Sequence, residues 1–279
     1  MKVSQIALVA VCLLLVVLLY AFGKTKTPIE EALAKSGMPS TEATKEISPS
    51  FVIEMWNSRL SEVRRDSAVM LQKRLQLKTG EEKVAATDLK ENWQKWGNFE
   101  ASAYYSGVEA QNDPSPANYV SAGERIFAAS RIARGDTAVG PFMLDYGISL
   151  LQDAGEEYPE DADIKILLSR FYVDGKGAVM QGVGLLREVT AKDSSHVEAN
   201  LLLGKLGIVS GQFDKAASRM ESVLVRAPKN AEAWYYLGEA KVGLGDKLGA
   251  TKAFEECMKL AEEPGFKREL ENYIKEINK

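Results

Sequence analysis

The sequence has few of the residues that build metal sites and disulfide bonds. Among its 279 residues there is one histidine, His196, and the two cysteines, Cys12 and Cys257, lie more than 240 positions apart. A site of several histidines or cysteines cannot be assembled from these residues, so we expect no metal and no other cofactor. Cys257 has no plausible disulfide partner, and cysteine usage therefore says nothing about the redox compartment.

The chain also has no excess of basic over acidic residues. The chain has 35 Lys and Arg against 39 Asp and Glu, which gives a net charge of −4 at pH 7. A nucleic-acid-binding surface requires clustered basic residues. We therefore expect no nucleic-acid partner.

Residues that could form a hydrolytic site are sparse. His196 follows Ser194 and Ser195 directly and precedes Glu198, whereas a catalytic triad needs groups that converge from separate elements. We predict no catalytic residues and no enzymatic activity, with an enzyme as a remote alternative.

One long apolar run lies at the N-terminus. Residues 3–23 carry no charge, and at 1.5 Å of rise per residue they would span about 31 Å, the thickness of a hydrocarbon core. Lys2 and the small residues Ala21 and Gly23 also resemble a cleavable signal sequence. Because the run is long and ends in the bulky pair Tyr20 and Phe22, we favour an uncut transmembrane anchor over 1–23, with the rest of the chain outside the cytoplasmic membrane.

Two segments follow the anchor. Residues 24–50 contain three of the nine prolines and many Thr, Ser and Lys residues, which predicts a flexible linker. Residues 51–80 form an amphipathic helix, because apolar residues recur at helical spacing between Phe51 and Leu77. This helix could face anionic lipid or pair with a second copy, giving a homo-oligomer; the alternative is that it packs against the body. The apolar positions are Trp56, Leu60, Val63, Met70, Leu71 and Leu75.

An internal period of 34 residues dominates the C-terminal part. Residues 197–230 align without gaps on residues 231–264. Matching positions pair Leu203-Gly204 with Leu237-Gly238, Gly211 with Gly245, Ala216 with Ala250 and Met220 with Phe254. At these residues the chain resembles the tetratricopeptide repeat (TPR) family, whose unit is a helix-turn-helix of 34 residues.

Earlier copies are degenerate. Units are indicated over 81–116, with Trp93 in the aromatic position, over 117–161, and over 162–196, which has one extra residue in its turn. Residues 265–279 have one apolar face and predict a capping helix. The resemblance implies an all-α fold in which the units of 81–264 stack into a right-handed superhelix with a concave groove.

The resemblance also implies which side chains line that groove, since family members use positions two, five, nine and twelve of the first helix. Lys and Asn at positions five and nine, which hold a chaperone tail in some members, are absent here. Arg170 and Lys205 could grip a carboxylate, or they could form surface ion pairs with Asp163, Glu198 or Glu239. The groove residues are Asp163, Ile166, Arg170 and Val173; Glu198, Leu201, Lys205 and Ile208; Glu232, Tyr235, Glu239 and Val242.

The layout of span, linker and repeats is similar to bacterial single-pass TPR proteins of the cell envelope. The resemblance implies a protein-binding scaffold or chaperone-like adaptor in the inner membrane, with its body in the periplasm and a segment of an envelope protein as partner. The alternative is an architectural oligomer that pairs through residues 51–77.

Overall fold

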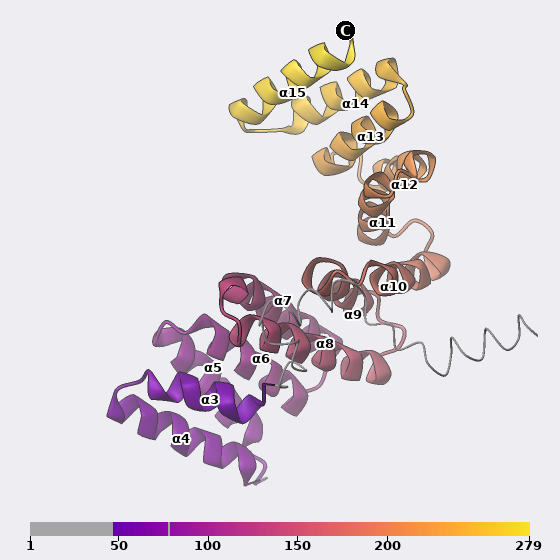
Figure 1. Ribbon diagram of the computed structural model, residues 1–279. Helices are drawn as coiled ribbons and strands as arrows, with labels where there is room; N and C mark the ends of the chain where they lie inside the picture. Colours follow the sequence, from indigo (N-terminus) through magenta and orange to yellow (C-terminus); the bar gives the residue numbers. More distant parts are fainter. Residues whose placement is uncertain (1–46, 78) are drawn as a thin grey trace, which may run out of the picture. The chain divides into compact units, whose positions relative to one another are not determined.

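The computed structural model describes residues 47–77 and 79–279, and within these ranges the secondary structure is entirely helical. Thirteen α-helices, α3 to α15, follow one another through this part of the chain (Figure 1), which confirms the all-α class. The predicted span over 1–23 lies outside the described residues, as does nearly all of the predicted linker. No helix within the described ranges is long and apolar enough to cross a membrane.

The segment predicted as one helix over 51–80 is instead two helices, α3 (Pro49–Ser58) and α4 (Glu62–Gln76). Helix α3 starts inside the predicted linker, where the Ser48 hydroxyl accepts the amide hydrogen of Phe51. The chain breaks at residues 59–61, where the guanidinium of Arg65 donates to the carbonyls that end α3 at Asn57, Ser58 and Leu60. The single-helix prediction was wrong because an arginine satisfies this helix end with no proline or glycine to signal it.

The two helices pack against the body. Trp56 of α3 is buried against Trp93, Tyr104 and Phe142, with ring centroids 5.9–6.4 Å apart. Val63 and Met70, which a single helix would place on the apolar face, are exposed. The segment over residues 51–77 therefore packs against the helices that follow it, which was the alternative to a helix that faces lipid or a second copy.

Ten further helices form five consecutive pairs, each of which begins within one residue of the start of a predicted repeat segment. Side-chain caps start the first helices of four pairs, since Ser115, Asp161, His196 and Asn230 accept a backbone amide hydrogen at the N-terminus. The pairs are α5 (Glu82–Lys95) with α6 (Phe99–Asn112), α7 (Pro116–Ile132) with α8 (Val139–Glu157), α9 (Ala162–Arg170) with α10 (Val179–Lys192), α11 (Val197–Val209) with α12 (Phe213–Arg226), and α13 (Ala231–Gly243) with α14 (Lys247–Leu260).

The turns inside the pairs follow the period. Gly211 and Gly245 have φ of 72° and 75°, a left-handed conformation that glycine adopts without strain. The extra residue of the third pair lengthens its first helix into a π-helix, η2 (Phe171–Lys176). A one-residue insertion is commonly absorbed in this way. Between α7 and α8 the chain instead makes a 3-10 turn, η1 (Ala133–Gly135).

The helices of a pair approach closely where the repeats place glycine. A Cβ atom on Gly204 would lie 2.1 Å from the end of Met220, and one on Gly238 would lie 2.3 Å from the Phe254 ring. Both ring and thioether are fully buried. The recurring glycine of the first helix and the recurring large residue of the second therefore contact each other within each of these two units.

The last helix, α15 (Pro264–Ile277), closes the stack beside α14 (Figure 1). Leu270 is buried, and the other apolar residues on its face pack against a cluster of Ala250, Phe254 and Cys257. This is the packing that the apolar spacing over residues 265–279 predicts.

Candidate protein-binding surface

The twelve predicted groove residues lie on α9 with η2, on α11 and on α13. Asp163, Glu198 and Glu232 are exposed, and Ile166 is buried. The other eight are half-buried: Arg170, Val173, Leu201, Lys205, Ile208, Tyr235, Glu239 and Val242.

Three aliphatic residues among the predicted groove residues pack in or against the hydrophobic core. Ile166 is 3% exposed and belongs to a cluster with Leu186 and Leu203, so its assignment to the groove was wrong. Leu201 and Ile208 pack against the cluster formed by α12 and α13. These contacts arise because each unit must bury its apolar faces against its neighbours.

Arg170 and Lys205 occupy equivalent places on successive first helices. Arg170 makes an ion pair of 2.6 Å with Glu124 of α7, and Lys205 one of 2.9 Å with Glu232 of α13. Each cation also lies 5.2 Å from the centroid of an aromatic ring, Phe127 and Tyr236 respectively. Both cations therefore form ion pairs, but not with Asp163, Glu198 or Glu239, the partners that the sequence suggested. Glu232, which pairs with Lys205, is itself one of the predicted groove residues.

The surroundings of Lys205 stabilise the protonated form of its side chain. Burial opposes it, but the hydrogen bond to Glu232 and the nearby carboxylate of Asp174 raise the pKa of Lys205 above its ordinary value. Lys205 therefore stays protonated throughout the physiological range.

A small pocket joins these two cations. We call it the α9–α11 pocket; it has a volume of about 80 Å³, the space of two to three water molecules. Its walls are mainly aliphatic and its rim is charged. The lining residues are Ser169, Arg170, Val173, Asp174, Leu186, Leu202, Lys205 and Leu206.

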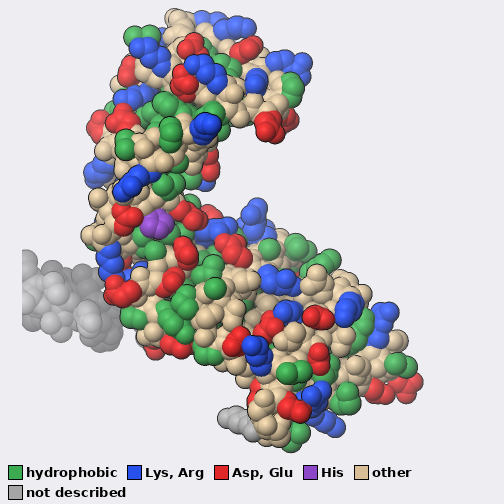
Figure 2. Space-filling model, turned by 180° about the vertical axis from the view of Figure 1, so that it is seen from behind, with side chains coloured by type: hydrophobic (Ala, Val, Ile, Leu, Met, Phe, Trp, Pro, Cys, Tyr) green, Lys and Arg blue, Asp and Glu red, His purple; other side chains and the backbone are tan. Residues whose placement is uncertain are grey.

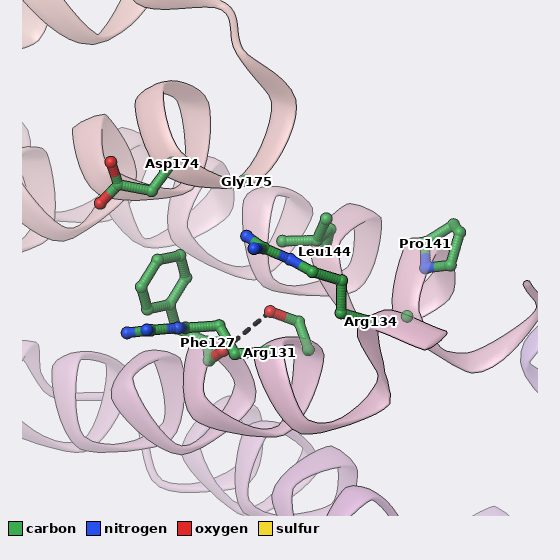
Figure 3. Close-up of a pocket in the computed structure, with 9 residues that line it drawn as sticks. Phe127, Arg131, Arg134, Pro141, Leu144, Asp174 and Gly175 are labelled. Carbon is green, nitrogen blue, oxygen red and sulfur yellow. Dashed lines mark hydrogen bonds between the residues drawn. The ribbon is translucent and has the colours of Figure 1, made fainter. Parts of the chain in front are cut away.

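A larger pocket adjoins it and shares Asp174. This α7–α8 pocket has a volume of about 320 Å³ and takes residues from α7, η1, α8 and η2 (Figure 3). Arg170 links the two pockets, because it lies over the Phe127 ring that lines the larger one. The lining residues are Phe127, Ser130, Arg131, Arg134, Gly140, Pro141, Leu144, Asp174 and Gly175.

None of the α7–α8 pocket was predicted as a site. Arg134-Gly135-Asp136 and Gly140-Pro141 are recognisable in sequence only as the connection between two helices. The available signal was the irregular length of the 117–161 unit, whose turn differs from the glycine turns of the other units.

At the last unit the capping helix contacts part of the predicted groove. Tyr235 and Val242 pack against the α14–α15 cluster, and the Tyr235 ring lies 6.1 Å from that of Phe266. Both residues remain half-buried, and their assignment to the groove stays a prediction.

Glu239 is a half-buried carboxylate beneath the same helix. Its Oε1 atom is buried and has no hydrogen-bond partner among the described residues. Burial raises the pKa of Glu239 above its ordinary value, and the hydroxyl of Tyr273 on α15 opposes this shift only in part. Glu239 therefore binds its proton more tightly in the folded state than in the unfolded state.

We expect Glu239→Gln to raise the free energy of unfolding at pH 7 by about 1 kcal/mol, because the ionised buried oxygen is removed. Since the folded pKa exceeds the unfolded value, the parent chain is stabilised below the unfolded pKa and loses that stability as pH rises through the folded pKa. Urea unfolding from pH 4 to 8 should show the two proteins converging at low pH. Glu269→Gln, at an exposed site on α15, is the control. A constant difference at all pH values would contradict this assignment.

His196 has a structural role at the start of α11. Its Nδ1 atom accepts the amide hydrogen of Ala199, while the Ser195 hydroxyl bonds to Asp193 and Arg226. Figure 2 shows the histidine at the surface, with acidic and basic side chains interspersed over this face. In the part of the chain that the structure describes, no group of three His, Cys, Asp or Glu residues is placed to hold a metal ion.

The consecutive stacked helix pairs define a helical-repeat protein. No protein-family model matches the chain. TPR repeat-containing protein PA0015 of Pseudomonas aeruginosa is 29% identical over 83 residues, which are 30% of this chain and 79% of that protein.

Solved structures that resemble the chain include two proteins described as TPR proteins. A tetratricopeptide repeat protein from Parabacteroides merdae matches 70% of this chain and 73% of its own, with a TM-score of 0.53 and 13% identity. YrrB, described as a TPR protein with an unusual peptide-binding site, matches 74% of this chain and 99% of its own, with a TM-score of 0.47 and 15% identity. The Parabacteroides structure shows that the fold is that of tetratricopeptide repeats, and the Pseudomonas relative supports this family.

Proposed function

We propose that the chain is a non-enzymatic scaffold or adaptor that holds a segment of a partner protein along α7, α9 and α11. The observation that carries the proposal is the pair of adjoining pockets that share Asp174. Aliphatic walls with a few charged groups at the rim suit an extended peptide, whose side chains enter the pockets while the rim fixes its orientation. TPR proteins as a class bind proteins, which agrees with this use of the surface.

Arg170→Ala combined with Lys205→Ala tests the proposal. Because each of these partly exposed ion pairs contributes less than about 1 kcal/mol, the melting temperature should change little. Recovery of partner proteins from a membrane extract on the immobilised full-length chain should fall about tenfold, as loss of a charged hydrogen bond would give. Lys192→Ala with Lys259→Ala removes two exposed ion pairs elsewhere and is the control. Equal recovery on all three proteins would contradict the proposal.

We propose further that residues 1–23 anchor the chain in the cytoplasmic membrane, with residues 48–279 in the periplasm and an envelope protein as partner. The support is the uncharged run over residues 3–23. Alkaline phosphatase fused after Lys279 should then be active, since it folds only outside the cytoplasm. An inactive fusion that is still membrane-bound would place the body on the other side.

Pairing of two chains through residues 51–77 is not favoured by the packing. Trp56 and Leu71, the residues that a pairing helix would use, are buried within the chain itself. The scaffold proposal therefore places the partner on the pockets and not on α3 or α4.

A further inference from the structure

Two arginines of the α7–α8 pocket are not engaged by the rest of the protein. Arg131 at the end of α7 and Arg134 in η1 are exposed, and neither makes an ion pair or a side-chain hydrogen bond with any described residue. Arg170, which lies over the Phe127 ring, is bound to Glu124. The contrast leaves two guanidinium groups whose donors face only solvent and the pocket.

Two acidic side chains lie at or near the pocket, and neither makes an ion pair with Arg131 or Arg134. Asp145 of α8 makes an ion pair of 2.5 Å with Lys176 of η2. Asp174 lines the pocket and is exposed, and Figure 3 shows its side chain turned away from Arg134, so one carboxylate faces two arginines among the lining residues. The pocket therefore carries net positive charge in a chain whose net charge is −4.

The remaining walls are apolar or backbone. Figure 3 shows Arg134 reaching alongside Leu144 toward the Phe127 ring, with Pro141 at one end. Gly175 lets η2 approach Leu144, since a Cβ there would lie 2.7 Å from that side chain. The volume of about 320 Å³ is the space of roughly ten water molecules, enough for a carboxylate and a neighbouring aliphatic side chain.

We propose that Arg131 and Arg134 bind a carboxylate of the partner segment, while Leu144 and Pro141 contact an apolar side chain beside it. Arginine suits this role because its planar guanidinium matches a carboxylate with two parallel hydrogen bonds. The assignment rests on the proposed function and adds the chemistry of the ligand: an acidic residue next to an apolar one, or an apolar C-terminal residue with its free carboxylate.

Selection from displayed octapeptide libraries on the full-length chain tests the assignment. One library presents the peptides internally and the other presents free C-termini, so the two sources of carboxylate are separated. We expect enrichment of Asp or Glu beside Leu, Ile or Val, or of free apolar C-termini. Replacing Asp or Glu by its amide, or amidating the C-terminus, should weaken binding of the enriched peptide about tenfold.

Variants of the chain complete the test. Arg131→Ala with Arg134→Ala should weaken the same peptides about tenfold, whereas Arg64→Ala with Arg268→Ala, two exposed arginines elsewhere, should not. Arg131→Glu with Arg134→Glu should select Lys or Arg in place of the acid, a gain that a misfolded protein could not produce.

The outcomes separate the two proposals. Enriched peptides that lack a carboxylate preference, or that bind the Arg131→Ala, Arg134→Ala protein unchanged, would overturn the carboxylate assignment. If those peptides still required Arg170 and Lys205, the proposed function would stand. No enriched peptide in either library would overturn both.

Discussion

Phe254→Ala is expected to lower the free energy of unfolding by about 3–5 kcal/mol, the range for a large aromatic side chain lost from a core. Phe254 is fully buried and joins three helices. Its ring lies 5.8 Å from that of Tyr235 on α13 and 5.4 Å from that of Tyr273 on α15. Loss of the ring therefore weakens both the last helix pair and the docking of the cap.

Urea unfolding followed by circular dichroism measures this effect. Val225→Ala on α12, at a residue that is 82% exposed, should change stability by less than about 0.5 kcal/mol. A cost below about 1 kcal/mol for Phe254→Ala would contradict the packing.

A double-mutant cycle isolates the contact with Gly238. Gly238→Ala alone should cost about 1–3 kcal/mol, because its Cβ meets the Phe254 ring. In the Phe254→Ala background most of that cost should vanish, since the space is then free.

Trp56→Ala should lower the free energy of unfolding by a similar amount, about 3–5 kcal/mol. Trp56 is 1% exposed and packs among aromatic rings from α5, α6 and α8. Its loss should expose α3 to proteolysis as well as lower the melting temperature, because α3 is held to the unit chiefly by this side chain and Val52.

Val63→Ala on α4 is the matched control. A single helix over 51–77 would bury Val63 on the same face as Trp56, but the residue is 81% exposed. We expect a change of less than about 0.5 kcal/mol. Equal costs at the two positions, or a change of oligomeric state with Trp56→Ala alone, would support the single pairing helix instead.

The repeat period predicts much of the fold because it records contacts between residues that are close in sequence. Gly204 and Met220, or Gly238 and Phe254, belong to one unit, so their spacing carries the geometry of one helix crossing. The break between α3 and α4 is not marked by any repeated spacing in the sequence. It depends on Arg65 reaching the carbonyls of the preceding helix, and arginine is otherwise an ordinary helix residue.

The candidate site was predicted less well because stacking decides which face of a first helix remains open. Position five of the third unit, Ile166, is buried by α10 and α11, and the corresponding residue of the last unit, Tyr235, is half-buried and contacts α15. Arg131 and Arg134 were missed for the same reason. Their pocket exists only because η2 of the next unit lies over the turn between α7 and α8.

Site-specific photo-crosslinking measures the central claim, that the partner lies along α7, α9 and α11. The crosslinker is placed at Leu144, Val173 or Leu202 in the pockets, and at Met180 or Val225, which are exposed on second helices. The account predicts adducts of one partner from the three pocket positions and none from Met180 or Val225. Adducts from Met180 or Val225, with none from the three pocket positions, would contradict it.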